Sequence, residues 1–125
     1  MTLIVGFGAR TGVAAGVLAD AVRGVLADEG LACTAVAVLA TLDRRAAEEG
    51  PREFAAAAGW RLLGFPASEL AGQPVPTPSA VVGMAVGTPS VAEAAALRAA
   101  GPGGRLIVAK RVRSGVTVAV ARPAG

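Results

Sequence analysis

The stretch 87–96 constrains the fold more than any other part of this 125-residue chain. A glycine and a proline interrupt whatever precedes it, and Ser90 stands where its hydroxyl oxygen can accept a hydrogen bond from the first free amides of a helix. Glu93 follows at the capping-box spacing, and an alanine-rich run continues until Gly101. These residues predict a loop leading into a thin helix that can pack closely on a sheet.

The start of this predicted helix is also a candidate binding site. First-turn amides have no partner inside their helix, and the positive end of the helix dipole favours anions. One interpretation is a scaffold helix whose cap only stabilises it. The other is a loop in which Gly87, Thr88 and Ser90 present backbone amides to a carboxylate-rich ligand.

Composition limits the core and the classes of function. Hydrophobic residues make up 54% of the chain but aromatic residues only 3%, so the core must consist of Ala, Val and Leu. The net charge is +3, and the positive side is arginine apart from Lys110. We expect no nucleic-acid partner, because stacking aromatics are nearly absent and no nucleic-acid module is recognisable. A polyanionic small molecule fits the charge.

The sequence also argues against disulfide-bonded, metal-binding and membrane-spanning proteins. Cys33 is the only cysteine and histidine is absent, so we expect no internal disulfide, no Cys/His metal site and no cofactor. The longest uncharged apolar run, 31–42, is too short to span a bilayer, and the N-terminus lacks the features of a signal peptide. We therefore expect a cytoplasmic protein without a membrane partner.

The first third of the chain predicts a strand, a glycine-rich turn and a helix. Residues 2–5 are continuously apolar, as in a strand buried on both faces, and 13–29 read as a helix. The glycines of the turn are spaced differently from the dinucleotide-binding fingerprint, which argues against a nucleotide. We interpret it as a tight turn with Arg10 free to contact an anion. The apolar stripe of the helix consists of Leu18, Val22, Val25 and Leu26.

The middle of the chain predicts two more strands. The second strand spans Thr34 to Leu39, and a short helix after it begins at a cap formed by Thr41 or Asp43. Arg44 and Glu48 are spaced to pair on the surface of that helix.

A further helix and a third strand follow. Pro51 begins the helix, which ends at Gly59, and the strand occupies 60–65. A helical turn at 68–70 comes next.

Prolines dominate the next segment. Alternating prolines make 73–78 an extended connector, and Ser79 caps a short helix over 80–86.

The C-terminal part predicts a hairpin with strands at 105–110 and 116–121, joined by a turn at Ser114-Gly115. The order of elements then predicts an α/β fold, a three-layer sandwich in which a mixed five-stranded sheet carries helices on both faces. We expect residues 1–125 to form a single domain.

Four segments together resemble the CobE and CbiG C-terminal domain family of cobalamin biosynthesis. They cover nearly the whole chain, in the right order and spacing, and the third is the most specific. The segments are Gly6-Phe7-Gly8-Ala9-Arg10, Ala40-Thr41-Leu42-Asp43, the run 87–95, and Lys110 followed by 116–122.

The resemblance implies a domain that acts on corrin-ring intermediates. In CbiG proteins this domain is the C-terminal part of an enzyme that opens the δ-lactone of cobalt-precorrin-5A and releases acetaldehyde, whereas CobE is a stand-alone protein. Because the chain starts at its own Met1 without an N-terminal partner domain, we expect the stand-alone form. Ala9 stands where family members often carry Cys, so either a thiol there is unnecessary or this protein has lost something that the family has.

The charge pattern agrees with an acidic ligand. Corrinoid precursors carry acetate and propionate arms, which basic side chains and free amides neutralise. The loops after parallel strands meet where open α/β sheets bind ligands. The alternative to ligand binding is that the basic cluster only solvates an exposed hairpin; its residues are Lys110, Arg111 and Arg113. The predicted ligand-binding residues are Gly6, Gly8, Arg10, Thr41, Asp43, Gly87, Thr88, Ser90 and Lys110.

Three functions remain open at this stage. The first, which we expect, is a module that binds a corrin intermediate and carries it or assists other pathway enzymes. The second is a lactone hydrolase, alone or with a partner domain, using Asp43 as a base or Lys110 as an activated group, although no nucleophile–base arrangement is recognisable. The third is a homo-oligomeric or methyltransferase-binding scaffold that pairs through alanine-rich faces.

Overall fold

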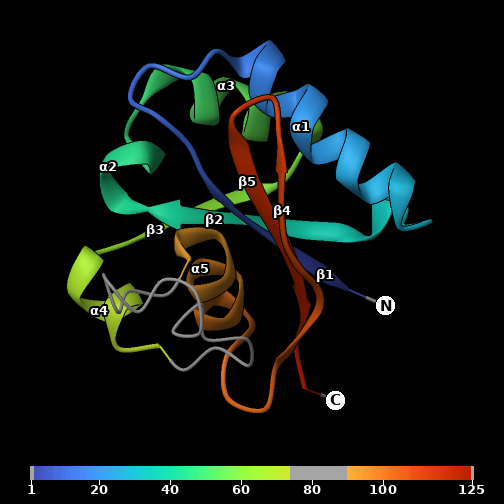
Figure 1. Ribbon diagram of the computed structural model, residues 1–125, viewed down its shortest axis with the longest axis vertical. Coiled ribbons are helices and arrows are strands. Elements are labelled where there is room, and N and C mark those ends of the chain that lie inside the picture. The colour runs from blue at the N-terminus through green and yellow to red at the C-terminus, as the bar shows by residue number, and fades with distance from the viewer. Residues whose placement is uncertain (1, 74–89, 125) are drawn as a thin grey trace.

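The computed structural model describes residues 2–73 and 90–124, which form a five-stranded sheet covered by helices (Figure 1). The strand order is β3-β2-β1-β5-β4. The strands are β1 (Leu3–Gly8), β2 (Val36–Leu42), β3 (Arg61–Phe65), β4 (Arg105–Arg113) and β5 (Val116–Arg122).

Strand directions bring four strand ends to one edge of the sheet. β1 is parallel to β2 and β2 to β3, while β5 is antiparallel to both β1 and β4. β4 therefore runs in the same direction as β1. We call the edge where β1, β2, β3 and β4 end the carboxyl edge.

Helices cover both faces of the sheet (Figure 1). α1 (Ala15–Asp28) and α3 (Glu49–Ala58) lie on one face, and α5 (Val91–Ala100) and α4 (Ala67–Ala71) lie on the other. The short helix α2 (Asp43–Ala46) follows β2 directly. The expected three-layer α/β sandwich with a mixed five-stranded sheet is confirmed.

The α1 face holds the large apolar side chains. Leu3, Val5 and Phe7 of β1 belong to one cluster with Phe54 of α3 and Trp60. Phe54 and Trp60 pack edge to face with 5.2 Å between ring centroids. The predicted stripe of α1 is confirmed, since its buried residues are Leu18, Ala21, Val22, Val25 and Leu26.

The α5 face is thin because its facing residues are small. A Cβ placed on Gly6 would lie 2.0 Å from the carbonyl oxygen of Ala92 and 2.9 Å from the Cβ of Ala96. The backbone of α5 therefore rests almost directly on β1. The alanine-rich run that predicted this helix is what permits so close an approach.

The ends of α5 match their predicted caps. The Ser90 hydroxyl oxygen accepts a hydrogen bond from the Glu93 amide at 3.5 Å. At the other end Gly101 adopts φ 82°, a left-handed value that favours glycine. The hairpin turn is also confirmed, with positive φ at both Ser114 (54°) and Gly115 (77°).

Several predicted boundaries were wrong. The second strand is Val36–Leu42 rather than 34–39, because 33–35 forms a 3₁₀ turn before it. The strand predicted at 105–110 continues to Arg113, because pairing with β5 extends to the hairpin turn. α3 begins at Glu49, two residues before Pro51, which occupies the first turn where its missing amide is tolerated.

Residues 74–89 lie outside the described part of the chain. The predicted helix over 80–86, its Ser79 cap and nearly all of the extended stretch 73–78 fall there. Within the described residues, no helix has the length and apolar character needed to cross a membrane.

Candidate functional site

An open hollow of about 330 Å³ lies on the α5 face at the carboxyl edge. It exists because β1 ends in Gly8, whose missing side chain leaves space between α5 and the paired residue Thr117 of β5. We call it the α5-side hollow. Its lining residues are Gly8, Ser90, Val91, Ala92, Lys110, Val112 and Thr117.

The first turn of α5 forms one wall of this hollow. First-turn amides have no acceptor within their own helix, and the dipole places partial positive charge at this end. The Ser90 hydroxyl oxygen accepts a hydrogen bond from the Glu93 amide. The two residues before Glu93 in the helix, Val91 and Ala92, line the hollow, although Ala92 has no exposed surface. A carboxylate is the kind of group that such a wall accepts.

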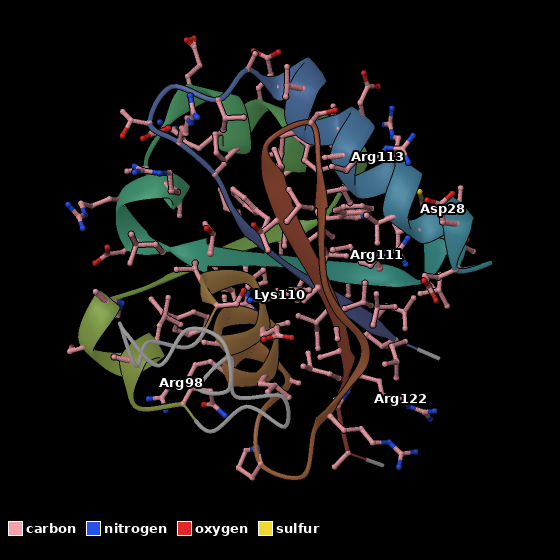
Figure 2. The ribbon with its side chains drawn as sticks, viewed as in Figure 1. Asp28, Arg98, Lys110, Arg111, Arg113 and Arg122 are labelled. Carbon is pink, nitrogen blue, oxygen red and sulfur yellow. The ribbon has the colours of Figure 1, made fainter. Side chains whose placement is uncertain are left out.

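Lys110 lies opposite this helix start, at a bulge in β4. Val108 pairs with Val120 and Arg111 pairs with Val118, so two residues of β4 oppose the single intervening residue of β5. The Lys110 side chain is exposed and lines the hollow beside α5 (Figure 2). Within the described residues, no carboxylate forms an ion pair with its ammonium group.

The Lys110 backbone amide has a partner of its own. It donates to Glu93 Oε2 at 3.0 Å, across 17 positions of sequence. Glu93 is only 1% exposed. No pattern in the sequence predicts this contact, since the capping-box spacing points only to a local role for Glu93.

The neighbouring arginines of β4 turn to the opposite face (Figure 2). Arg113 lies 3.3 Å from Asp28 Oδ2, and Arg111 pairs with Glu29 and, at 3.8 Å, with Asp28. Both acidic residues come from the end of α1. The basic run Lys110–Arg113 is therefore divided between two faces rather than gathered into one patch.

Arg10 lies in a different hollow, of about 420 Å³, on the other side of β1. This α1-side hollow is formed by the loop 9–14, Val17 and the hairpin tip 114–116. Arg10 is exposed there. The structure therefore brings Gly8, Ser90 and Lys110 together but places Arg10 apart from them.

Two side chains of the α2 region hold the loop that carries Arg10. Arg45 Nε donates to the Ala9 carbonyl at 2.9 Å, and the Arg45 guanidinium also pairs with Glu48 at 2.8 Å. Glu48 in turn accepts from the Gly12 amide at 2.9 Å. The predicted pairing of Arg44 with Glu48 was wrong, because the turn after α2 places Arg45 on the side that faces the loop.

Thr41 and Asp43 also differ from expectation. Thr41 is fully buried, and its hydroxyl donates to the Phe7 carbonyl at 2.8 Å, joining β2 to β1. The cap of α2 is Leu42, which makes no side-chain cap bond, so the prediction of a Thr41 or Asp43 cap was wrong. Asp43 is exposed and lines neither hollow.

Three predicted site residues remain: Gly6, Gly87 and Thr88. Gly6 lies beneath α5 and serves its close approach to β1. Gly87 and Thr88 lie outside the described residues. The predicted binding residues did not include four that line the hollow, namely Val91, Ala92, Val112 and Thr117. An apolar residue within the basic run 110–113 was a signal that could have found Val112.

The chain is similar to known proteins both in family and in structure. Residues 3–121 match the family model described as Cobalamin synthesis G C-terminus. The chain is similar to the crystal structure of CobE, a protein from the cobalamin (vitamin B12) biosynthetic pathway. Sequence identity is 31%, the match covers 96% of this chain and 92% of that chain, and the TM-score is 0.80.

Two further solved structures are similar. The cobalamin biosynthesis protein chiG from Agrobacterium tumefaciens str. C58 is 34% identical over 99% of this chain and 100% of that chain, with a TM-score of 0.78. A cobalamin biosynthesis protein G homolog from Sulfolobus solfataricus is 23% identical, and its TM-score of 0.78 shows a shared fold. That match covers 100% of this chain and 38% of the longer one. No curated protein sequence matches.

Proposed function

The chain belongs to the cobalamin synthesis G C-terminal family and takes part in cobalamin biosynthesis, and from this premise we propose that it binds a corrin-ring intermediate in the α5-side hollow. The bound intermediate is held for the enzymes of the pathway. One observation carries the proposal: Lys110 and the first turn of α5 face one hollow from opposite sides.

The charges of this hollow suit an acidic ligand. An ammonium group and helix N-terminal amides both stabilise carboxylates, and charge-assisted hydrogen bonds are about twice as strong as neutral ones. Lys110 is available for this role, because the carboxylates of Asp28 and Glu29 pair with the arginines on the other face. Acetate and propionate arms of a corrin intermediate are groups of the required kind.

The apolar residues of the hollow suit the ring itself. Val112 is 71% exposed and lines the hollow together with Val91 and Ala92. Small-molecule sites are lined mainly by apolar side chains with a few polar groups among them. A macrocycle with an apolar face and acidic arms would cover these valines and place its arms near Lys110.

The arrangement favours binding over lactone hydrolysis. Asp43, the candidate base, does not line the hollow that contains Lys110, and the Thr41 hydroxyl is already bonded to the Phe7 carbonyl. Hydrolysis needs a base within hydrogen-bond reach of the attacking group. We therefore expect the purified protein to release no acetaldehyde from the lactone of cobalt-precorrin-5A, and release at an enzymatic rate would contradict the proposal.

A titration tests the binding function directly. Hydrogenobyrinic acid is added to the protein at low salt, and the change in ring absorbance is followed for wild type, Lys110→Met and Arg111→Met. Lys110→Met should weaken binding about tenfold, equal to about 1.4 kcal/mol. Arg111→Met is the matched control, because Arg111 lies on the same strand but pairs with Glu29 on the other face. A wild-type protein that leaves the ring absorbance unchanged refutes the proposal.

A further inference from the structure

Glu93 and Thr41 are the buried polar or charged side chains of the described residues, and only Glu93 carries a charge. We propose that Glu93 is a positioning residue: its carboxylate holds the bulge of β4 so that the side chain of Lys110 projects over the α5-side hollow. The role rests on the proposed function, since it gives Lys110 its place toward the ligand. Glu93 itself does not line the hollow.

The bulge between Val108 and Arg111 sets which face each basic residue takes relative to Val108. Successive side chains of a strand alternate between faces, so residue 110 of a regular strand would share the α1 face with Val108. The observed strand instead has Lys110 and Val112 at the α5-side hollow, and Arg111 and Arg113 paired with α1. The extra residue in β4 shifts the alternation by one position. β4 has a second irregularity between Leu106 and Val108, and the two together return Lys110 and Val112 to the side of the sheet on which Leu106 lies.

Glu93 supplies the hydrogen bond at this irregularity. A bulge interrupts the regular ladder and leaves a strand amide without its usual acceptor on the neighbouring strand. The Lys110 amide finds that acceptor in Glu93 Oε2 at 3.0 Å. Because Glu93 lies in the first turn of α5, the same side chain joins the helix wall of the hollow to the strand wall.

The sign of the charge supports a positional rather than an attractive role. A carboxylate placed near the hollow repels the acidic groups of the proposed ligand. Its direct electrostatic effect on binding is therefore unfavourable. Glu93 can therefore help ligand binding only through the position that it gives to Lys110.

Two substitutions separate geometry from charge. Glu93→Gln keeps a carbonyl acceptor for the Lys110 amide and removes the repulsive charge, so its affinity for hydrogenobyrinic acid should equal or exceed that of wild type. Glu93→Leu has no acceptor and should lose about as much affinity as Lys110→Met, about tenfold. The double variant Glu93→Leu/Lys110→Met should bind no more weakly than either single variant, because both act through one group. Additive losses overturn the proposal.

Amide hydrogen exchange gives a readout that needs no ligand. The Lys110 amide should exchange slowly in wild type and quickly in Glu93→Leu, while the amide of Val118 on β5 keeps its wild-type rate. Slow exchange at Lys110 in a folded Glu93→Leu protein overturns the positioning role, even where wild type binds the ring. Wild-type protein that binds no hydrogenobyrinic acid refutes the proposed function, and with it the ligand role of Glu93.

A gentler variant covers the case in which Glu93→Leu fails to fold. A neutral amide acceptor forms a weaker hydrogen bond than a carboxylate. The Lys110 amide of Glu93→Gln should therefore exchange faster than in wild type, with Val118 unchanged. A Glu93→Gln protein in which the Lys110 amide loses its protection while the affinity for hydrogenobyrinic acid stays at the wild-type value overturns the proposal.

Discussion

The basic residues of β4 are divided between the two faces of the sheet at the carboxyl edge, and they have different roles there. On the α1 face, large apolar side chains fill the core, and the arginines Arg111 and Arg113 pair with Asp28 and Glu29. On the α5 face, alanines and Gly6 bring the helix close to β1, and Lys110 faces an open hollow. Within the described residues, the arginines of β4 on the α1 face form ion pairs, whereas Lys110 on the α5 face is exposed to solvent.

This difference shows that residue type alone does not mark a binding site. Three basic residues lie within four positions of β4, yet only the one on the α5 face lines the hollow with α5. The two arginines are half exposed and paired, and such surface ion pairs contribute little beyond solvating the strand. The strand's alternation, reset by the bulge, determines which role each residue takes.

The largest expected effect concerns the thin face itself. In Gly6→Ala the new Cβ would meet the Ala92 carbonyl oxygen at 2.0 Å, so α5 must move away from β1. We expect a loss of about 3 kcal/mol in the free energy of unfolding, measured by urea denaturation, as for severe overpacking of a core.

Gly8→Ala is the matched control two residues along the same strand. Its Cβ would lie 3.5 Å from the Cβ of Val91, an ordinary contact, so stability should change by less than about 1 kcal/mol. The added methyl group narrows the α5-side hollow, so affinity for hydrogenobyrinic acid should fall although the fold persists. Equal stability losses for the two variants would contradict the close approach of α5 at Gly6.

Arg45 offers the next largest effect, on the opposite side of β1. Arg45→Met removes both the hydrogen bond to the Ala9 carbonyl and the half-buried pair with Glu48. We expect a stability loss of about 1–2 kcal/mol, because a hydrogen bond from a charged group and its carboxylate partner are both lost. Arg44→Met is the control, since Arg44 is exposed at the adjacent position and should cost less than about 0.5 kcal/mol.

Local signals explain what could be predicted from the sequence. The Ser90 cap, the Ser114-Gly115 turn and the apolar stripe of α1 all depend on residues within a few positions of one another, and all three were predicted correctly. The order of these elements was sufficient for the sandwich architecture. The family resemblance came from the same short segments and is confirmed by the match over residues 3–121.

Long-range contacts explain what was missed. The choice of Arg45 over Arg44 depends on where the loop at Ala9 passes, which no local pattern encodes. The two irregularities of β4 depend on its register against β5, and the hydrogen bond from the Lys110 amide to Glu93 spans 17 positions, so alternation along 105–110 encodes neither. Arg10 and Lys110 were placed in one predicted site because both carry the charge that an acidic ligand needs, but β1 and its turn separate their hollows.

Arg10 provides a smaller test of that separation. If the ring occupies the α5-side hollow, Arg10 acts on it only at a distance, through solvent on the other side of β1. Arg10→Gln should therefore weaken hydrogenobyrinic acid binding about threefold or less at low salt, and less still at physiological salt, where screening acts over about 8 Å. A loss as large as that of Lys110→Met would show that the ligand spans both hollows.

Asp28 gives the smallest expected effect and the sharpest comparison of the two faces. Asp28→Asn leaves Arg113 without its carboxylate and weakens the pairing of Arg111, so positive charge on the α1 face rises. Stability should fall by less than about 0.5 kcal/mol, because the side chains are about half exposed and such pairs are screened. Affinity for the acidic ring should rise less than about twofold at low salt and return to the wild-type value at high salt. A larger, salt-independent gain would mean that the released arginines contact the ring, and that the face assigned here to structure is the one that binds.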